Sequence, residues 1–521
     1  MSTVVSQQST LEPSLVRRLT RRVHGTSGEH LSINSPINRA HLADVPVSTV
    51  EDVNQAFRFA RRAQRAWAES TVAHRASVLL RFHDLVLQHR DEGLDLVQQE
   101  TGKARRDALE EILDVCIVAR HYGRDGRRVL RPKRHRGVLP FVVGVREFHH
   151  PKGVIGVIAP WNYPLTLAIT DALPALLAGN AVVLKPDSQT PLTALWALEL
   201  LREAGLPDDV MSIVVGAGSK LGPAIVAESD YLMFTGSTRV GRVLAAACGE
   251  RLIGCSMELG GKNALIVCDD ADLPRAAEVA VRACFANAGQ LCISIERMYI
   301  HRSVWDEFLS LFIPRVARMR LEVGVGWGAD MGSLISEGQL RTVESHVDDA
   351  TAKGASVLAG GKARPDLGPY AYEPTVLADV TADMTVYREE TFGPVVSVYP
   401  FDTDDEVVAA SNDTEYGLNG SVLTRSWKRG HDIAQRLRVG TVNINEGYAA
   451  AFGSNTSTMG GMGDSGMGRR HGDEGLLKYT ESQTVANQRL LGLGAQFGLS
   501  DEQWGNALTV SIGIMKRLGL K

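Results

Sequence analysis

A cysteine and a glutamate, each in a glycine-containing segment, are the residues of this chain best suited to do chemistry. Cys292 ends the segment Gly289-Gln290-Leu291-Cys292, and Glu258 begins Glu258-Leu259-Gly260-Gly261-Lys262. A cysteine on a turn can be a nucleophile, and a carboxylate can be its base or activate a water. Neither is convincing alone, because single cysteines are usually buried hydrophobes and single glutamates are usually solvated. A third segment, Pro160-Trp161-Asn162-Tyr163-Pro164, strengthens the hypothesis of an enzyme site.

Three further segments indicate nucleotide binding when they are taken together. The spacing Gly216-x-Gly218-x-x-x-Gly222 is one residue longer than the usual dinucleotide fingerprint and is weak evidence. The run from Gly236 to Gly241 is better placed, because it follows an apolar stretch and opens a predicted helix, whose free N–H groups can bind an anion. Lys185 follows another apolar run and could reach ribose or phosphate oxygens. A dinucleotide lying across a sheet would use all three.

The elements that must hold these residues alternate between strand and helix. Each predicted strand precedes a helix, which is typical of a parallel sheet covered on both faces; the strands are 154–158, 181–184, 212–215 and 231–234. Ligands then bind at the carboxyl ends of the strands, where Lys185, Gly216 and Thr235-Gly236-Ser237 fall. A second alternation follows Glu258, with a strand at 264–267, a helix at 273–288 and a strand at 298–300, and it carries Cys292.

The N-terminal part has no evident chemistry. Residues 1–28 are polar and rich in arginine and predict a loose arm. Apolar residues at helical spacing predict a helix over 51–68 and a second helical region over 73–121, broken near Thr101-Gly102. These helices would cover one face of the sheet.

Composition excludes several classes of protein. The chain has 521 residues and a net charge of −4, so no overall basic field would attract nucleic acid. The N-terminus has no signal sequence and no apolar run reaches roughly 18 residues, so we expect no membrane segment. The six cysteines lack metal-ligand spacing, which predicts no metal site and free thiols in the cytoplasm. The mildly amphipathic stretch 508–520 favours a helix packed on the protein surface over a membrane-surface helix.

Seven motifs in order make the chain resemble the aldehyde dehydrogenase superfamily from about residue 30 to 487. They are 160–164, Lys185-Pro186, Phe234-Thr235-Gly236-Ser237-Thr238, 258–262, 289–292, Glu389-Glu390-Thr391-Phe392-Gly393-Pro394 and Gly440-Thr441-Val442-Asn443. The resemblance implies an α/β fold with two doubly wound α/β domains, a Rossmann-like cofactor domain and a catalytic domain, plus a small β bridging element for oligomerisation. The implied cofactor domain comprises residues 1–130 and 149–260, and the catalytic domain 261–460. Residues 131–148 and 461–490 would form the bridging element, and 491–521 a C-terminal extension.

The resemblance also implies a role for each site residue. Cys292 would attack an aldehyde to give a thiohemiacetal, with the oxyanion held by the Asn162 amide and the Cys292 backbone N–H. Hydride transfer to nicotinamide leaves a thioester, and Glu258 would activate the water that hydrolyses it. The implied cofactor-binding residues are Trp161, Lys185, Ser188, Gly236, Ser237, Leu259, Glu390 and Phe392. Glu390 would bind the nicotinamide ribose.

Two residues bear on cofactor and product. NAD-preferring members of the family often carry glutamate where this chain has Ser188, so the resemblance favours NADP, with NAD also possible. Coenzyme A-acylating relatives typically lack the glutamate at position 258, so its presence favours a free carboxylic acid as product. A coenzyme A-dependent enzyme and a catalytically silent relative serving as a binding protein remain the rival interpretations.

The substrate is less well defined. Residues 230–234, 282–290 and 459–466 resemble the bacterial NADP-dependent succinate-semialdehyde dehydrogenases. The arginines of well-studied succinate-semialdehyde enzymes are replaced by Ala286 and Thr170, and a usual Pro-Phe by Thr458-Met459. Arg282 or Arg297 could compensate. Succinate semialdehyde is therefore the expected substrate, and a medium-sized aliphatic or aromatic aldehyde is the alternative.

The resemblance further predicts self-association. Residues 137–149 and 476–485 are similar to the bridging strands of the family, which pair between subunits and cover open sheet edges. We expect a homodimer or homotetramer.

Overall fold

The chain folds into two compact units. The computed structural model describes residues 11–137, 143–488 and 494–519. The larger unit comprises residues 1–129 and 151–479, and the smaller comprises 130–150 and 480–521. Residues 461–479, which the sequence assigned to the bridging element, therefore belong to the larger unit, because β17 pairs there and α18 packs against α7.

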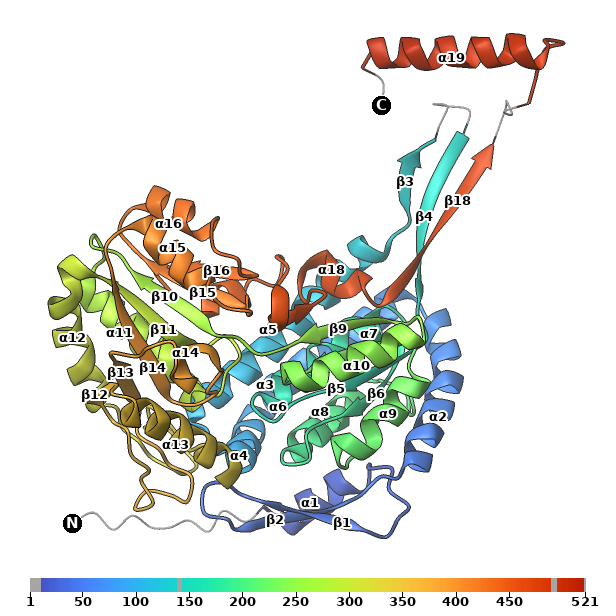
Figure 1. Cartoon of the computed structure of the whole chain (residues 1–521). Helices are drawn as coiled ribbons and strands as arrows, with labels where there is room; N and C mark the ends of the chain where they lie inside the picture. Colours follow the sequence, from blue (N-terminus) through green and yellow to red (C-terminus); the bar gives the residue numbers. More distant parts are fainter. Residues whose placement is uncertain (1–10, 138–142, 489–493, 520–521) are drawn as a thin grey trace. The chain divides into compact units, whose positions relative to one another are not determined.

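One sheet of the larger unit holds the predicted strands (Figure 1). In spatial order its strands are β17 (Gly466–Met467), β9 (Gly254–Glu258), β8 (Tyr231–Thr235), β5 (Val154–Ile158), β6 (Ala181–Lys185) and β7 (Met211–Ile213). All pair in parallel except β17, which is antiparallel to β9. The order places the crossover point between β5 and β8, so the chain leaves these two strands in opposite directions and opens a crevice at their carboxyl ends.

Helices cover both faces of this sheet. Apolar residues of α2 (Val50–Glu69), α9 (Gly218–Glu228) and α10 (Thr238–Glu250) form one buried cluster with the strands. On the other side, α7 (Ala172–Leu177) contacts β6, and α8 (Pro191–Glu203) contacts β7. The helix predicted over 51–68 is α2, begun by a capping box between Thr49 and Asp52.

The second sheet lies in the same unit and carries the cysteine-bearing segment. Its strands in order are β12 (Ser356–Ala359), β13 (Thr375–Ala378), β14 (Val395–Phe401), β11 (Ile295–His301), β10 (Asn263–Val267), β15 (Asn419–Leu423) and β16 (Thr441–Ile444). Only β12 is antiparallel to its neighbour. One core contains residues of α11 (Leu273–Phe285), α12 (Trp305–Ala317) and α13 (Glu337–Ala352), and another contains α15 (Asp404–Asn412) and α16 (Trp427–Ala434).

The N-terminal part is more helical than its sequence suggested. The region predicted as one helix broken near Thr101 is three: α3 (Val72–Gln88), α4 (Arg90–Thr101) and α5 (Arg105–Leu130). The break at Gly102 has a positive φ of 71°, which glycine adopts without strain. Residues 11–28 are not simply a loose arm, because they include α1 (Pro13–Thr20), whose Leu19 is buried. A short antiparallel pair, β1 (His30–Asn34) and β2 (His41–Pro46), follows. The first ten residues of the predicted arm lie outside the described residues.

The remaining short elements of the larger unit connect these layers. They are α6 (Pro164–Ile169), α14 (Thr385–Arg388), α17 (Ala449–Phe452) and α18 (Gly472–Leu477), with single 3-10 turns at Ala286–Gly289, Arg302–Val304 and Gly463–Ser465. Residues of α6 and the first of these turns lie next to the predicted nucleophile and oxyanion groups.

The smaller unit is a three-stranded sheet and a helix. Its strands are ordered β18 (Thr480–Gln488), β4 (Val143–Pro151) and β3 (Lys133–Arg136), and its helix is α19 (Asp501–Arg517). The predicted segment 131–148 includes β3 and most of β4, and the end of the predicted segment 461–490 forms β18. Residues 138–142 and 489–490 lie outside the described part. The helix expected over 508–520 begins earlier, at Asp501, where Ser500 and Gln503 form a capping box.

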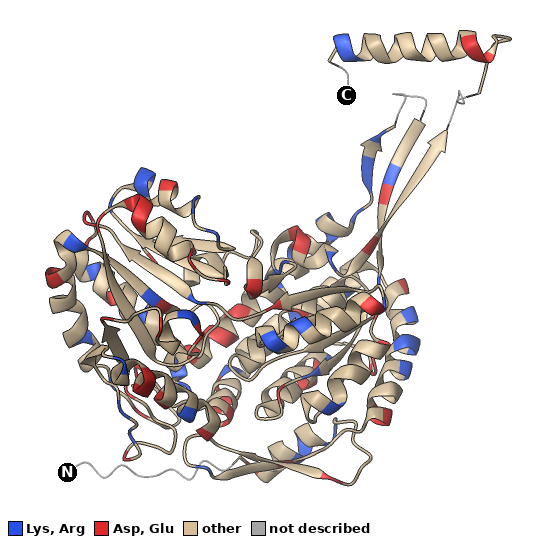
Figure 2. Ribbon diagram, viewed as in Figure 1, with Lys and Arg blue, Asp and Glu red and all other residues tan. Residues whose placement is uncertain are grey.

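Charges of both signs alternate over the larger unit, without one extended basic face (Figure 2). In the part of the chain that the structure describes, no helix is long and apolar enough to cross a membrane. The same residues contain no group of three or more His, Cys, Asp and Glu side chains that could hold a metal ion. All six cysteines are free thiols.

Candidate active site

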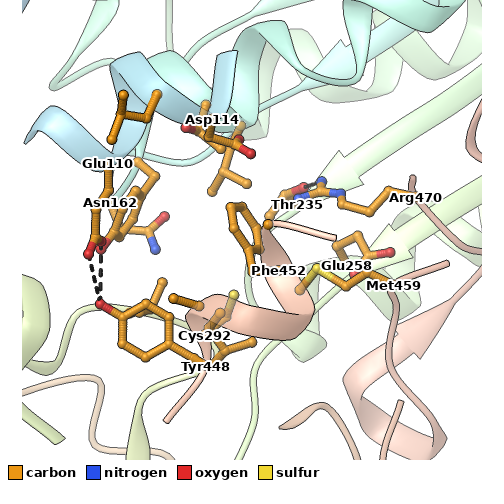
Figure 3. Close-up of a pocket in the computed structure, with 18 of the residues that line it drawn as sticks. Glu110, Asp114, Asn162, Thr235, Glu258, Cys292, Tyr448, Phe452, Met459 and Arg470 are labelled. Atoms are coloured by element: carbon orange, nitrogen blue, oxygen red, sulfur yellow. Dashed lines mark hydrogen bonds between the residues drawn. The ribbon is translucent and has the colours of Figure 1, made fainter. Parts of the chain in front are cut away.

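Three sequence-predicted residues meet between two pockets (Figure 3). Asn162 follows β5, Glu258 ends β9, and Cys292 lies in the turn before β11. We call one space the apolar pocket; it encloses about 890 Å³ including its open mouth, and Leu113, Ile117, Tyr448, Phe452 and Met459 are among its walls. We call the other, of about 710 Å³, the glycine-lined pocket, after Gly236 and Gly260. Both pockets are lined by Asn162, Leu167, Thr235, Glu258 and Cys292.

The turn that presents Cys292 has a constrained backbone. Asn287, Ala288 and Gly289 all have positive φ values, of 51°, 53° and 70°. A Cβ at Gly289 would lie 2.0 Å from the carbonyl oxygen of Gly393, so only glycine fits against the Glu390–Gly393 loop. Two non-glycine residues in the left-handed region indicate strain that the surrounding packing holds in place, as is common at active sites.

Buried polar residues fix Asn162 beside this turn. Its Nδ2 donates to the carbonyl oxygen of Gln290 at 3.1 Å, and an amide has a second N–H left for a ligand. Its backbone carbonyl accepts from Lys103 Nζ at 2.7 Å. The fully buried Lys103 pairs with Glu111 at 2.6 Å, and Glu111 accepts from the first N–H groups of α6, on Leu165 and Thr166. No motif or spacing in the sequence singles out Lys103 or Glu111.

The electrostatics of the two candidate catalytic groups differ. Burial raises the pKa of the Cys292 thiol to about 12, opposed by Arg470 and reinforced by Glu390 and Glu258. Burial raises the pKa of Glu258 to about 7, again opposed by Arg470. Glu258 Oε1 is buried without a hydrogen-bond partner among the described residues. At neutral pH the thiol is therefore protonated, and Glu258 is poised to exchange a proton.

The glycine-lined pocket gathers most of the predicted cofactor residues: Trp161, Gly236, Ser237, Leu259, Glu390 and Phe392. The rings of Trp161 and Phe392 meet edge to face, 5.5 Å apart at 87°. Glu390 accepts from the backbone N–H of Gly261 at 2.9 Å, and a Cβ at Gly260 would lie 2.2 Å from its other oxygen. Burial raises the pKa of Glu390 to about 8, with Glu296 adding to the effect. A buried carboxylate, a bare glycine backbone and an aromatic wall fit a ribose and a flat ring.

Lys185 and Ser188, also predicted to bind cofactor, lie elsewhere on the same sheet edge. Ser188 Oγ donates to the carbonyl oxygen of Gly216 at 2.9 Å, which joins the ends of β6 and β7. Lys185 Nζ donates to the carbonyl oxygen of Pro186 at 3.0 Å, and burial lowers its pKa. Three of the predicted nucleotide segments thus meet at the carboxyl edge of one sheet, since α10 begins there after Gly236 and Ser237.

The apolar pocket contains a charged residue that the sequence did not single out. Arg470 is 5% exposed and lines this pocket but not the glycine-lined one. In the sequence it is the second of two arginines in a glycine-rich stretch, and nothing there distinguishes it from a surface residue. Burial lowers its pKa, but Asp171, Glu258 and Cys292 raise it more, so the guanidinium is charged.

Neither arginine suggested as a substitute substrate ligand lies in the apolar pocket wall. Arg297 donates to the backbone carbonyls of Lys262, Ala410 and Ser411, which is a structural role. Arg282 is paired with Asp107 and Glu110 behind the wall. Ala286 is buried in the cluster that includes Tyr163 and Phe452, and Thr170 donates to the carbonyl oxygen of Thr166 at 2.7 Å.

Comparisons with known proteins agree with this arrangement. The sequence pattern described as "Aldehyde dehydrogenase family" matches residues 23–485. The chain is 57% identical over 477 residues, 92% of each chain, to a Mycolicibacterium smegmatis protein named "Putative succinate-semialdehyde dehydrogenase (NADP(+))". A solved structure titled "Crystal structure of E. coli NADP dependent enzyme" matches with a TM-score of 0.86 at 34% identity, covering 91% of this chain and 99% of that one.

A betaine aldehyde dehydrogenase from Staphylococcus aureus, solved in complex with NAD+, also matches. Its TM-score is 0.87 at 31% identity, covering 93% of this chain and 98% of that one. The predicted fold of two doubly wound α/β domains is thereby confirmed. A family pattern that spans most of the chain, with Cys292, Asn162 and Glu258 gathered between two pockets, leads to one assignment: the chain belongs to the aldehyde dehydrogenase family.

Proposed function

We propose that this enzyme oxidises succinate semialdehyde to succinate, with NADP as the preferred hydride acceptor and NAD as a possible second one. The observation that carries the proposal is the meeting of Cys292, Asn162 and Glu258 at the junction of a glycine-lined pocket and an apolar one. The Mycolicibacterium relative, named for this substrate and cofactor, supports it.

The acylation step follows from the buried thiol. Burial keeps the Cys292 thiol protonated, so the proton must leave as Sγ adds to the aldehyde carbon. Glu258, with a pKa of about 7, is partly ionised at neutral pH and is the base that accepts it. The carbonyl oxygen becomes an oxyanion, which the free N–H of the Asn162 amide and the backbone N–H of Cys292 stabilise. The chemistry that a bound nicotinamide supplies is acceptance of a hydride from that carbon, which leaves a thioester on Cys292.

Deacylation uses the same carboxylate. After the proton taken from the thiol has passed to solvent, Glu258 removes a proton from a water that adds to the thioester carbon. The C–S bond then breaks, Glu258 returns this proton to the Cys292 thiolate, and the acid leaves. Trp161, Leu259, Phe392 and Glu390 hold the nicotinamide and its ribose in the glycine-lined pocket. Lys185, Ser188, Gly236 and Ser237 bind the rest of the dinucleotide along the sheet edge.

A kinetic screen tests the proposal. Steady-state kcat/KM is measured for succinate semialdehyde, butanal and benzaldehyde with NADP and with NAD, with and without coenzyme A. We expect succinate semialdehyde with NADP to give the highest value, and succinate to form without coenzyme A. A higher value for butanal or benzaldehyde would replace the substrate, and a requirement for coenzyme A would replace the hydrolytic step.

We also propose that the enzyme works in the cytoplasm as a homodimer or homotetramer. Six free thiols support a reducing compartment. The strands β4 and β18, at the positions of the family's bridging segments, support assembly. Light scattering that returns the mass of one chain would contradict the assembly.

A further inference from the structure

One end of the apolar pocket carries a buried cluster with an excess positive charge. Arg470 Nη2 donates to Asp171 Oδ2 at 2.5 Å and to Thr235 Oγ1 at 3.2 Å. Lys478 Nζ lies 3.3 Å from the other oxygen of Asp171. Two cations therefore share one carboxylate, and all three side chains are almost fully buried. Glu258 and Asp114 line the same pocket, and burial raises the pKa of each to about 7. When these two acids are protonated the cluster has a cation excess, which is unfavourable unless an anion joins it.

Polar atoms around this cluster lack partners. Arg470 Nε is buried without a hydrogen-bond partner among the described residues, whereas Thr166 Oγ1 and the Asp114 carboxyl group interact with each other and have no further partner there. Arg470, Thr166 and Asp114 all line the apolar pocket, and Figure 3 shows Thr235 and Arg470 side by side with Asp114 on α5. Buried polar groups in proteins are nearly always hydrogen-bonded, so several open ones in one cavity indicate that a ligand supplies the partner.

The cluster also lies next to a position where related enzymes differ from this one. The resemblance drawn from the sequence implies an arginine at position 170, where this chain has threonine, and the Thr170 hydroxyl donates to the carbonyl oxygen of Thr166 on its own helix. Arg470 is anchored on Asp171, the next residue in the chain. A guanidinium from the C-terminal region is thus brought to the segment from which an arginine is missing.

We infer that Arg470 binds the carboxylate of the substrate, with the Thr166 hydroxyl and the carboxyl group of Asp114 completing the subsite. The inference rests on the proposed function and names its specificity-determining residue. Arginine is suited to this task because its planar N–H groups match a carboxylate, and Asp171 fixes its orientation from behind. The remaining walls, Leu113, Ile117, Leu167 and Phe452, cover the short carbon chain. Asp114 joins as a neutral carboxyl, donating its proton to the bound carboxylate.

The charge of the cluster argues against a cationic substrate. An amino aldehyde would need ionised Asp114 or Glu110 as its partner, but Glu110 is already paired with Arg282 and accepts from Tyr448. Its ammonium group would also lie beside Arg470 and Lys478. A carboxylate satisfies the open donors, whereas an ammonium group would leave them unpaired.

The test compares substrates that differ in one terminal group. We measure kcat/KM for succinate semialdehyde, butanal and 4-aminobutanal in the wild-type enzyme and in Arg470→Met, Arg470→Lys and Arg128→Met. Arg128 is the matched control, because it is an exposed arginine on α5 with a surface ion pair to Asp473. Loss of a charged hydrogen-bonding partner predicts that the ratio of kcat/KM for succinate semialdehyde over butanal falls about 100-fold in Arg470→Met. Any effect of Arg470 on the pKa values of Cys292 and Glu258 lowers both substrates and cancels in this ratio.

The outcomes separate the inference from the proposed function. If wild type prefers succinate semialdehyde and Arg470→Met keeps that preference, Arg470 does not bind the carboxylate, although the function stands. If Arg470→Met lowers both substrates equally, Arg470 acts on Cys292 or Glu258 instead, and the inference fails. If the wild-type enzyme has a higher kcat/KM for butanal or 4-aminobutanal than for succinate semialdehyde, both the proposed substrate and the inference about Arg470 fail.

A second variant keeps the test decisive if Arg470→Met does not fold. Arg470→Lys retains the charge and the pair with Asp171 but loses the planar fork, so the preference for succinate semialdehyde over butanal should fall about tenfold while butanal turnover persists. Arg128→Met should keep the wild-type ratio. We also measure product inhibition by succinate in Arg470→Lys. An unchanged ratio of kcat/KM for succinate semialdehyde over butanal, together with the wild-type inhibition constant for succinate, would overturn the inference.

Discussion

At the scale of single residues, the pKa of Glu258 sets the pH dependence of the reaction. Burial raises this pKa to about 7, and the base must be ionised to accept a proton. Activity limited by deacylation should therefore rise about tenfold per pH unit below 7 and level off above it. A steady-state profile of kcat checks this. A flat profile across pH 6 to 8, roughly the range around that pKa, would show that Glu258 is not the base in the slow step.

Ser188 is the residue at which cofactor preference can be changed. Its hydroxyl lies at the joined ends of β6 and β7, close in sequence to Lys185. A glutamate there would repel a 2′-phosphate and could accept from ribose hydroxyls, so Ser188→Glu should shift the NAD to NADP ratio of kcat/KM by about tenfold or more toward NAD. Ser188→Ala, which adds no charge, is the control. An unchanged ratio in Ser188→Glu would refute this role.

At the scale of elements, the catalytic residues depend on a buried ion pair between helices. Lys103 precedes α5 and Glu111 lies within it. Lys103 donates to the Asn162 carbonyl oxygen, and Glu111 accepts from the N-terminus of α6. Lys103→Met leaves Glu111 buried and unpaired, which should cost about 3–5 kcal/mol of stability. It should also lower kcat, because Asn162 loses its support.

The measurement is an unfolding temperature by calorimetry, together with kcat. Arg58→Met, which breaks an exposed pair with Glu51, is the control and should leave both unchanged. A Lys103→Met protein as stable and active as wild type would show that the pair only fills space.

The sequence predicted helices and strands well where the spacing of apolar residues and the positions of the motifs agreed. Strands 154–158 and 231–234 match β5 and β8, because each is a short, continuous apolar run of strand length that a predicted helix follows. The helical region 73–121 was predicted with one break, near Thr101-Gly102, and the structure has two. The second break, at His89, has no glycine or proline, and it depends on packing that period alone does not reveal.

At the scale of the whole molecule, the motifs found the reacting groups but not what holds them. Cys292, Glu258 and Asn162 stand in recognisable segments, whereas Arg470, Asp171, Lys103 and Glu111 are ordinary charged residues until burial is known. Charged side chains are rarely buried, so a prior based on composition places them at the surface. Their contacts join residues far apart in the chain, such as Arg470 and Asp171.

The C-terminal extension is separable from the chemistry. The family pattern ends at residue 485, and among the residues that the structure describes none beyond Arg470 lines either pocket. A chain ending at Gln488 should therefore retain kcat/KM within about threefold, as expected when no interaction with the transition state is removed. The steady-state assay on the shortened chain checks this. A fall of more than tenfold, about the effect of losing a contact, would assign the extension a part in the site.

In the proposed mechanism Glu258 activates the water that hydrolyses an acyl group carried by Cys292. Intact-mass measurement of Glu258→Gln after mixing with succinate semialdehyde and NADP tests it most directly. We expect an adduct of one succinyl group per chain on Cys292. The Cys292→Ala variant should be inactive and should carry no adduct. Near-normal turnover in Glu258→Gln, or an adduct on another residue, would contradict it.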